Sequence, residues 1–123
     1  MHRSRLAGFI IDCQNADLPH AASFWSAALG MPTGAHQGNY IALDGSSRDL
    51  SIEVQSVDHP SRLHLDIESD DVEAEAQRLE KLGAKRVGPV NTWIVLEAPT
   101  GQRFCVIRAK RSLDGVPGAQ LWR

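Results

Sequence analysis

Ionisable side chains occupy every second position of one predicted strand in this 123-residue chain. Between Arg62 and Glu68, the polar residues His64, Asp66 and Glu68 alternate with aliphatic residues. An alternation of period two places these three side chains on one face of a β-strand. An imidazole beside a carboxylate can transfer a proton or bind a divalent metal. His64 and Asp66 are therefore candidate catalytic residues, and a purely structural hydrogen-bonding role for each of them stays open.

Other predicted strands carry side chains that could meet a ligand. Glu53 and Gln55 alternate with apolar residues between positions 49 and 57, so one face of this strand is apolar and the other can form hydrogen bonds. Cys105 lies between Phe104 and Val106, where it is either a small core residue or a thiol that faces a ligand. The candidate ligand-binding residues can stack, hydrogen-bond or coordinate, and they are Tyr40, Gln55, Trp93, Arg103 and Cys105.

The elements that would position these residues fall into two similar series. The first series begins with an apolar strand over residues 7–13, followed by a helix with an N-cap at Asp17 and a stop at Gly30. Proline and glycine residues predict a loop over residues 31–38. Strands at 39–44 and 49–57 then flank a hairpin-type turn over residues 44–47.

The second series repeats this order. After the strand over residues 62–68, Asp70 and Glu73 form a capping-box-like helix start, and the helix ends at Gly83. Strands are predicted at 86–90, 93–97 and 103–107. The helix segments 17–30 and 70–83 have equal length and both end in Leu-Gly, which indicates an internal duplication.

The duplication predicts an α+β fold of two paired βαβββ modules. Module one would cover about residues 6–57 and module two about 62–109, followed by a tail at 110–123, all in one domain. We expect the helices on the outside of a curved mixed sheet, with the polar strand faces around a cleft. Trp122, in the tail, is expected to be either disordered or docked, for instance on a second subunit.

Composition narrows the classes of protein to consider. The chain is 42% hydrophobic and 23% charged, with a formal net charge of −2, which is typical of a globular domain. The start of the sequence leads into no signal-peptide core, so we expect a cytoplasmic protein without membrane partners. The tail is locally basic but lacks interleaved aromatic residues, which argues against a nucleic-acid partner. Both cysteines, Cys13 and Cys105, are expected to be reduced.

Four stretches of the sequence carry a resemblance to a known family, and they lie at residues 9–13, 24–30, 62–67 together with 70–72, and 98–106. In these stretches the chain resembles the glyoxalase-like proteins of the vicinal-oxygen-chelate superfamily, also called the glyoxalase/bleomycin resistance/dioxygenase superfamily. The resemblance implies a glyoxalase-like protein that binds or transforms a small oxygen-rich organic molecule in the cleft, as a lyase, isomerase or dioxygenase. The alternative that it implies is a non-catalytic small-molecule or antibiotic-binding protein of the bleomycin-resistance type.

The resemblance also bears on cofactors and assembly. Metal-using members hold a divalent ion with side chains from the first and last strands of each module, and His64 occupies such a position. Ile10 stands at the matching position of module one, and Cys105 stands where a carboxylate is usual. A divalent metal such as Zn, Ni, Mn or Fe is thus possible, with His64 and either Glu53 or Gln55 as ligands. The resemblance further implies a homodimer.

Overall fold

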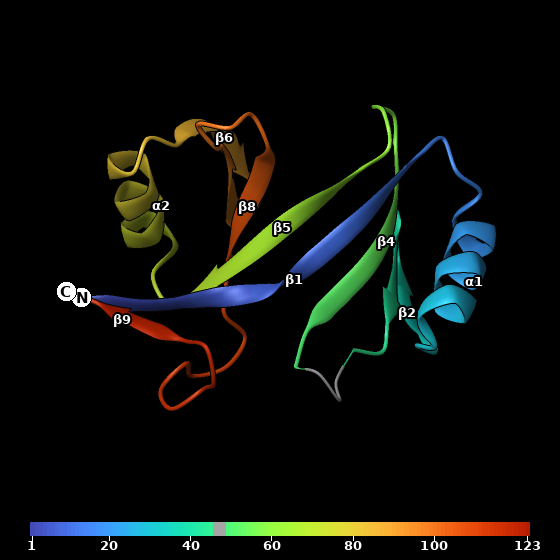
Figure 1. Ribbon diagram of the computed structural model, residues 1–123, viewed down its shortest axis with the longest axis horizontal. Helices are drawn as coiled ribbons and strands as arrows, with labels where there is room; N and C mark the ends of the chain where they lie inside the picture. The colour runs from blue at the N-terminus through green and yellow to red at the C-terminus, as the bar shows by residue number, and fades with distance from the viewer. Residues whose placement is uncertain (46–48) are drawn as a thin grey trace. The chain divides into compact units, whose positions relative to one another are not determined.

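The computed structural model describes residues 1–45 and 49–123 of the chain. Within these residues it contains two helices and nine strands, which form two compact units (Figure 1). The N-terminal unit is Gly8–His64, and the C-terminal unit combines Met1–Ala7 with Leu65–Arg123. The predicted α+β class with two βαβββ modules is confirmed. The turn predicted at residues 44–47 falls partly outside the described residues.

The sheet of the N-terminal unit has the strand order β2-β3-β4-β1. Its strands are β1 (His2–Gln14, from Gly8 onward in this unit), β2 (Thr33–Gln37), β3 (Tyr40–Leu43) and β4 (Ser51–Val57). The pair β1 and β4 is parallel, and the other pairs are antiparallel. The parallel pair exists because helix α1 (Leu18–Leu29) provides the long connection that parallel strands need.

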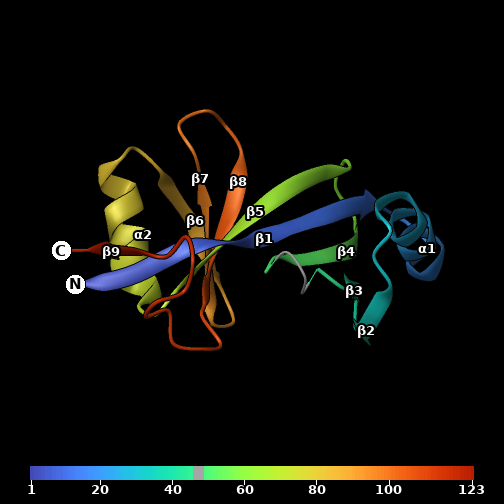
Figure 2. The same cartoon turned by 60° about the horizontal axis from the view of Figure 1, so that its bottom comes forward.

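Helix α1 begins and ends where local signals predict. The Asp17 carboxylate accepts a hydrogen bond from the His20 amide, and Gly30 ends the helix in the left-handed conformation. The helix packs on one face of the sheet (Figure 2). The core there consists of Ile11, Leu18, Ala22, Met31, Ile41, Leu43, Ile52 and Val54. Since strand side chains alternate, the neighbouring positions, including Asp12 and Gln55, lie on the opposite face.

One close backbone approach depends on a glycine. A Cβ atom at Gly8 would lie 1.7 Å from the carbonyl oxygen of Ser51, which is opposite Gly8 on β4. No side chain fits at that distance, so β1 can run beside β4 here only with glycine at position 8.

The sheet of the C-terminal unit has the order β5-β8-β7-β6, with β9 paired to the start of β1. The elements are β5 (Arg62–Ser69, from Leu65 onward in this unit), α2 (Val72–Lys81), β6 (Lys85–Val90), β7 (Trp93–Glu97), β8 (Arg103–Arg108) and β9 (Gln120–Trp122). Helix α2 covers one face of the sheet, where the core contains Ala76, Leu79, Leu96 and Val106.

The structure corrects three expectations about these elements. The predicted loop over residues 31–38 contains strand β2. All five residues of this strand are exposed, so its sequence shows no alternation of buried apolar and exposed polar residues. The N-cap of α2 is Asp71, which accepts from the Ala74 amide, whereas Asp70 accepts from the backbone amide of Arg3. Glu73 belongs to no capping box and pairs with Arg86 on the surface instead.

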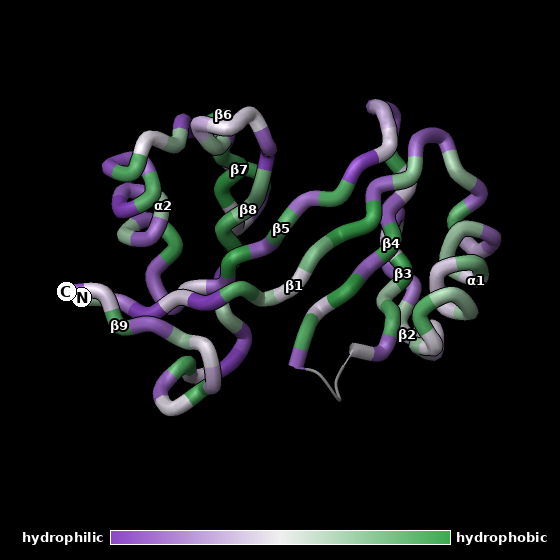
Figure 3. Tube along the Cα trace, in the orientation of Figure 1, coloured by the Kyte–Doolittle hydropathy of each residue, from purple (hydrophilic) through white to green (hydrophobic). Residues whose placement is uncertain are grey.

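The burial of the two faces of β5 also differs from the expectation that its aliphatic face is the buried one. Figure 3 shows the alternation of hydrophilic and hydrophobic residues along this strand. The aliphatic residues Leu63 and Leu65 are 60% and 51% exposed, whereas the carboxylate residue Asp66 is only 8% exposed. The polar face of β5 is thus the more buried one at this point.

Candidate functional site

A buried carboxylate and an imidazole meet in the N-terminal unit. Asp12 on β1 is 2% exposed, and its Oδ2 lies 2.8 Å from Nδ1 of His64 on β5. Within the part of the chain that the structure describes, the other oxygen, Oδ1, is buried without a hydrogen-bond partner. Because buried polar atoms are nearly always paired, an oxygen of this kind is unusual in a folded protein.

The bond to Asp12 determines which nitrogen of His64 can react. A carboxylate accepts hydrogen bonds, so this bond requires a proton on Nδ1 of His64, and the Nδ1–H group is the donor. The neutral ring then has its lone pair on Nε2. This arrangement prepares Nε2 to accept a proton or to bind a metal ion, and Asp12 acts through the imidazole as a positioning residue.

Two further basic groups surround the same carboxylate. Nε of Arg62 and Nε2 of His59 lie 3.9 Å and 4.0 Å from Oδ2 of Asp12. Arg62 is about half exposed, and its guanidinium is 3.4 Å from the His59 ring. One buried carboxylate therefore faces three basic side chains, of which Arg62 always carries a positive charge.

The sheet register extends this cluster across three strands. Gln55 on β4 lies opposite Asp12 on β1, and Tyr40 on β3 lies opposite Gln55. Neighbouring strands are about 4.8 Å apart, so the three side chains form a row on the face away from α1. The predicted ligand-binding residues Tyr40 and Gln55 thus lie in line with Asp12. Glu53 precedes Gln55 by two residues on β4, so it lies on the same face, opposite Ile10 of β1.

Burial affects one titratable group next to this row. The pKa of the Cys13 thiol is raised above its usual value, first because burial disfavours the thiolate and second because Asp12 is negatively charged. A smaller opposing effect comes from a hydrogen bond with Trp25. The Cys13 thiol is therefore neutral and unsuited to nucleophilic chemistry.

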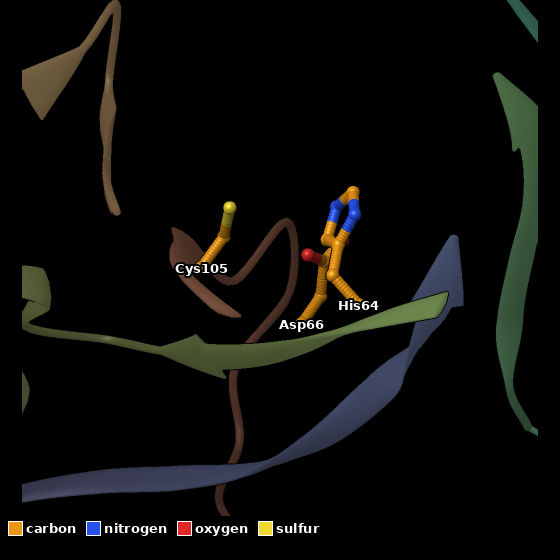
Figure 4. Close-up of side chains that lie close together, drawn as sticks. All are labelled: His64, Asp66 and Cys105. Carbon is orange, nitrogen blue, oxygen red and sulfur yellow. The ribbon is translucent and has the colours of Figure 1, made fainter. Parts of the chain in front are cut away.

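Asp66 and Cys105 lie opposite each other on the paired strands β5 and β8. Figure 4 shows their side chains and that of His64, which precedes Asp66 by two residues on β5 and points to the same side of that strand. One ligand atom from each of the three residues lies within 4.8 Å of the other two. A nitrogen, an oxygen and a sulfur donor suit zinc, whose catalytic sites use three protein ligands.

The other two predicted site residues lie on one face of the C-terminal sheet. The Nε of Arg103 is 3.2 Å from a carboxylate oxygen of Glu97, and both side chains are well exposed. Trp93 begins β7 opposite Val90 and is half-buried. Both residues belong to the C-terminal unit, whereas Asp12 belongs to the N-terminal one, and their ligand-binding roles stay predictions.

Asp12, His59 and Arg62 were not predicted as functional residues. The one signal in the sequence was the match of Asp12 to Asp66 in the duplicated strands, and that match equally suits a structural role. The hydrogen bond between Asp12 and His64 joins positions 52 residues apart, and such a contact cannot be read from local spacing.

Comparison with known proteins agrees with this architecture. Residues 8–107 match the model of the glyoxalase-like domain family. The chain belongs to this family, and its structural neighbours include a member of the glyoxalase/bleomycin resistance/dioxygenase superfamily from Vibrio splendidus 12B01. No protein of curated function matches it.

Three solved structures illustrate the similarity of fold. A hypothetical protein from Bacillus halodurans C-125 is 13% identical at a TM-score of 0.67, over 89% of this chain and 96% of its own. A methylmalonyl-CoA epimerase from Mycobacterium tuberculosis is 14% identical at a TM-score of 0.58, over 90% and 93%. The Mn(II)-bound glyoxalase from Novosphingobium aromaticivorans is 18% identical at a TM-score of 0.59, over 89% of this chain but 43% of its own. At these identities the likeness concerns the fold alone.

Within its described part, the chain has no helix long and apolar enough to cross a membrane.

Proposed function

We propose that this glyoxalase-like protein binds a small oxygen-rich organic molecule at the row formed by Tyr40, Gln55 and Asp12, and that His64 removes a proton from it. The single observation that carries the proposal is the 2.8 Å contact between Nδ1 of His64 and the buried Asp12 carboxylate. A histidine that is oriented by a buried carboxylate is one arrangement by which proteins achieve general base catalysis.

The reaction class follows from this base. Nε2 of His64 would take a proton from a carbon next to a carbonyl group, and the electron pair of the broken C–H bond would move into the carbonyl as an enolate. Return of a proton to the opposite face of the same carbon gives the epimer, and loss of a leaving group from the β-carbon with the enolate electron pair gives a lyase product. Asp12 would stabilise the imidazolium that forms.

The neighbouring groups suit an oxygen-rich ligand. The Tyr40 hydroxyl and the Gln55 amide can donate hydrogen bonds to carbonyl or hydroxyl oxygens. Arg62 adds positive charge beside the base, which would favour an enolate over its neutral precursor. Proteins of similar fold include a methylmalonyl-CoA epimerase and a glyoxalase.

A metal-assisted variant of the same proposal uses the donor atoms of His64, Asp66 and Cys105. These residues would hold a Zn-type divalent ion, with Ni, Mn or Fe as further candidates, and the ion would supply Lewis-acid polarisation of the ligand carbonyl. His64 would then serve as a metal ligand whose ring orientation is fixed by its hydrogen bond to Asp12.

The test measures deprotonation without knowledge of the product. Untagged protein in D₂O is offered a panel of 2-oxo acids, 2-hydroxy ketones and acyl thioesters, and proton NMR follows replacement of the C–H next to the carbonyl. We expect exchange that falls by about 100-fold in His64→Gln. His20→Gln, on the exposed side of α1, is the matched control and should keep the full rate.

Other outcomes separate the alternatives. Exchange that needs added Zn, Ni, Mn or Fe(II), together with elemental analysis showing metal that is lost in Asp66→Asn, would favour the metal-assisted variant. Binding of panel members without exchange would favour the non-catalytic binding protein. Exchange at the same rate in wild type and His64→Gln would contradict the proposal.

A further inference from the structure

A second candidate site lies in the C-terminal unit, on residues that the proposed function does not use. A cavity of about 280 Å³ is bounded by α2, the first residues of β1 and strand β9, which run close together in Figure 1. Its lining residues are Met1, His2, Ala74, Gln77, Arg78, Lys81, Trp122 and Arg123.

Basic side chains line this cavity. Its lining includes Arg78, Lys81 and Arg123 but no aspartate or glutamate. Lys81 is exposed, and in the described part of the chain it makes no ion pair. A lysine ammonium without an ion-pair partner at the rim of a cavity is available to a negatively charged ligand.

Hydrogen bonds to the buried carboxylate of Glu75 fix the position of the Arg78 side chain. Glu75 is 0% exposed, and its oxygens lie 2.7 Å and 2.8 Å from Nε and one terminal nitrogen of Arg78. The same carboxylate bonds His2 and Ser4, each at 2.8 Å. Such a two-point contact fixes the plane of the guanidinium, and it does so before any ligand arrives.

Trp122 forms a rigid aromatic wall beside Arg78. The Arg78 guanidinium carbon lies 3.8 Å from the centre of the indole ring, and the indole Nε1–H donates to Ser4 Oγ at 2.9 Å. The ring is therefore fixed on one side by a cation and at its edge by a hydrogen bond. A pre-formed wall of this kind lowers the entropy cost of binding.

We propose that this cavity binds a small organic phosphate whose ring or alkyl part contacts Trp122 and whose phosphate contacts Lys81. The charge of a phosphate monoester matches the cationic lining, and its apolar part matches the indole. The volume is slightly below the range of about 300–1,000 Å³ usual for ligand pockets, so the ligand is small. This site is independent of the His64 chemistry.

Isothermal titration of the full chain with phenyl phosphate, inorganic phosphate and phenol tests the proposal. Phenyl phosphate should bind more tightly than either of the other two probes and should shift the Trp122 indole N–H signal in NMR spectra. Lys81→Gln should weaken its binding by about three- to tenfold. Lys85→Gln, an exposed lysine on β6 outside the cavity lining, should leave the binding unchanged.

Two results would overturn the proposal. One is the absence of phenyl phosphate binding at millimolar concentration, and the other is an equal loss of binding in Lys81→Gln and Lys85→Gln. Thermal unfolding of each variant shows whether it is folded, and His64→Gln should bind phenyl phosphate as the wild type does.

Discussion

Asp12 and His64 are 52 residues apart in the sequence, and a carboxylate oxygen of one lies 2.8 Å from a ring nitrogen of the other. The carboxylate is buried, and its second oxygen has no hydrogen-bond partner among the described residues. An unsatisfied buried oxygen lowers the free energy of unfolding, by about 1–3 kcal/mol in proteins generally.

Asp12→Asn should strongly slow the hydrogen–deuterium exchange of the ligand C–H while changing the free energy of unfolding only slightly. The amide can no longer stabilise an imidazolium or reliably hold the Nδ1–H tautomer, so the exchange rate should fall by about 100-fold. The free energy of unfolding should change by about 1 kcal/mol, because one hydrogen bond loses its charge. Asp17→Asn, which keeps a good helix N-cap, is the control. A rate that does not change in Asp12→Asn would contradict the role of Asp12.

Glu75→Gln should destabilise the C-terminal unit strongly. The carboxylate is fully buried and accepts hydrogen bonds from Arg78, His2 and Ser4. Removal of its charge leaves Arg78 without a counter-ion, and we expect a loss of about 3 kcal/mol in urea unfolding. Glu80→Gln removes an exposed carboxylate that pairs with Arg86 and should cost less than about 1 kcal/mol. Equal losses in the two variants would show that the Glu75 network does not stabilise the unit.

The same carboxylate predicts a loss of stability in acid. Burial raises the pKa of Glu75, but hydrogen bonds from Arg78, His2 and Ser4 outweigh it and leave the pKa below its ordinary value of 4.5. A carboxyl group whose pKa is lowered by folding contributes stability above its unfolded pKa, and this contribution is lost as the pH falls through the folded pKa. Urea unfolding below about pH 4.5 should therefore show a steeper decline in wild type than in Glu75→Gln. Parallel curves would contradict the prediction.

Gly8→Ala should destabilise the N-terminal unit. The new Cβ would lie 1.7 Å from the Ser51 carbonyl oxygen, so β1 and β4 must move apart. We expect a loss of about 3 kcal/mol in thermal or urea unfolding. Gly88→Ala is the matched control, since no atom would lie within 4 Å of the Cβ that it adds, and it should change stability by less than about 0.5 kcal/mol.

Elements with strong local signals could be predicted from the sequence. Helix α1 follows from its Asp17 cap and Gly30 stop, and the duplication predicted the two modules. Strand β2 was missed because all its residues are exposed, so no alternation marks it. Strand β9 was missed because its identity as a strand depends on pairing with His2–Ser4 of β1, over 100 residues away in the sequence.

The candidate site could be predicted only in part. His64, Gln55 and Tyr40 were identified from strand alternation and resemblance, but the partner that orients His64 lies on another strand. Buried Glu75 was missed for a similar reason, since its hydrogen-bond partners His2 and Ser4 lie on β1, more than 70 residues away in the sequence. Homodimer assembly and a cytoplasmic location stay predictions.

The tautomer of His64, measured by nitrogen-15 NMR of the histidine rings, is the decisive test of whether Asp12 prepares this residue as a base. The assignment of signals by comparison with His64→Gln requires no substrate. We predict that neutral His64 carries its proton on Nδ1 in the wild type, and that Asp12→Leu shifts the population toward the Nε2–H form. A wild-type ring with its proton on Nε2 would contradict the proposed role of both residues.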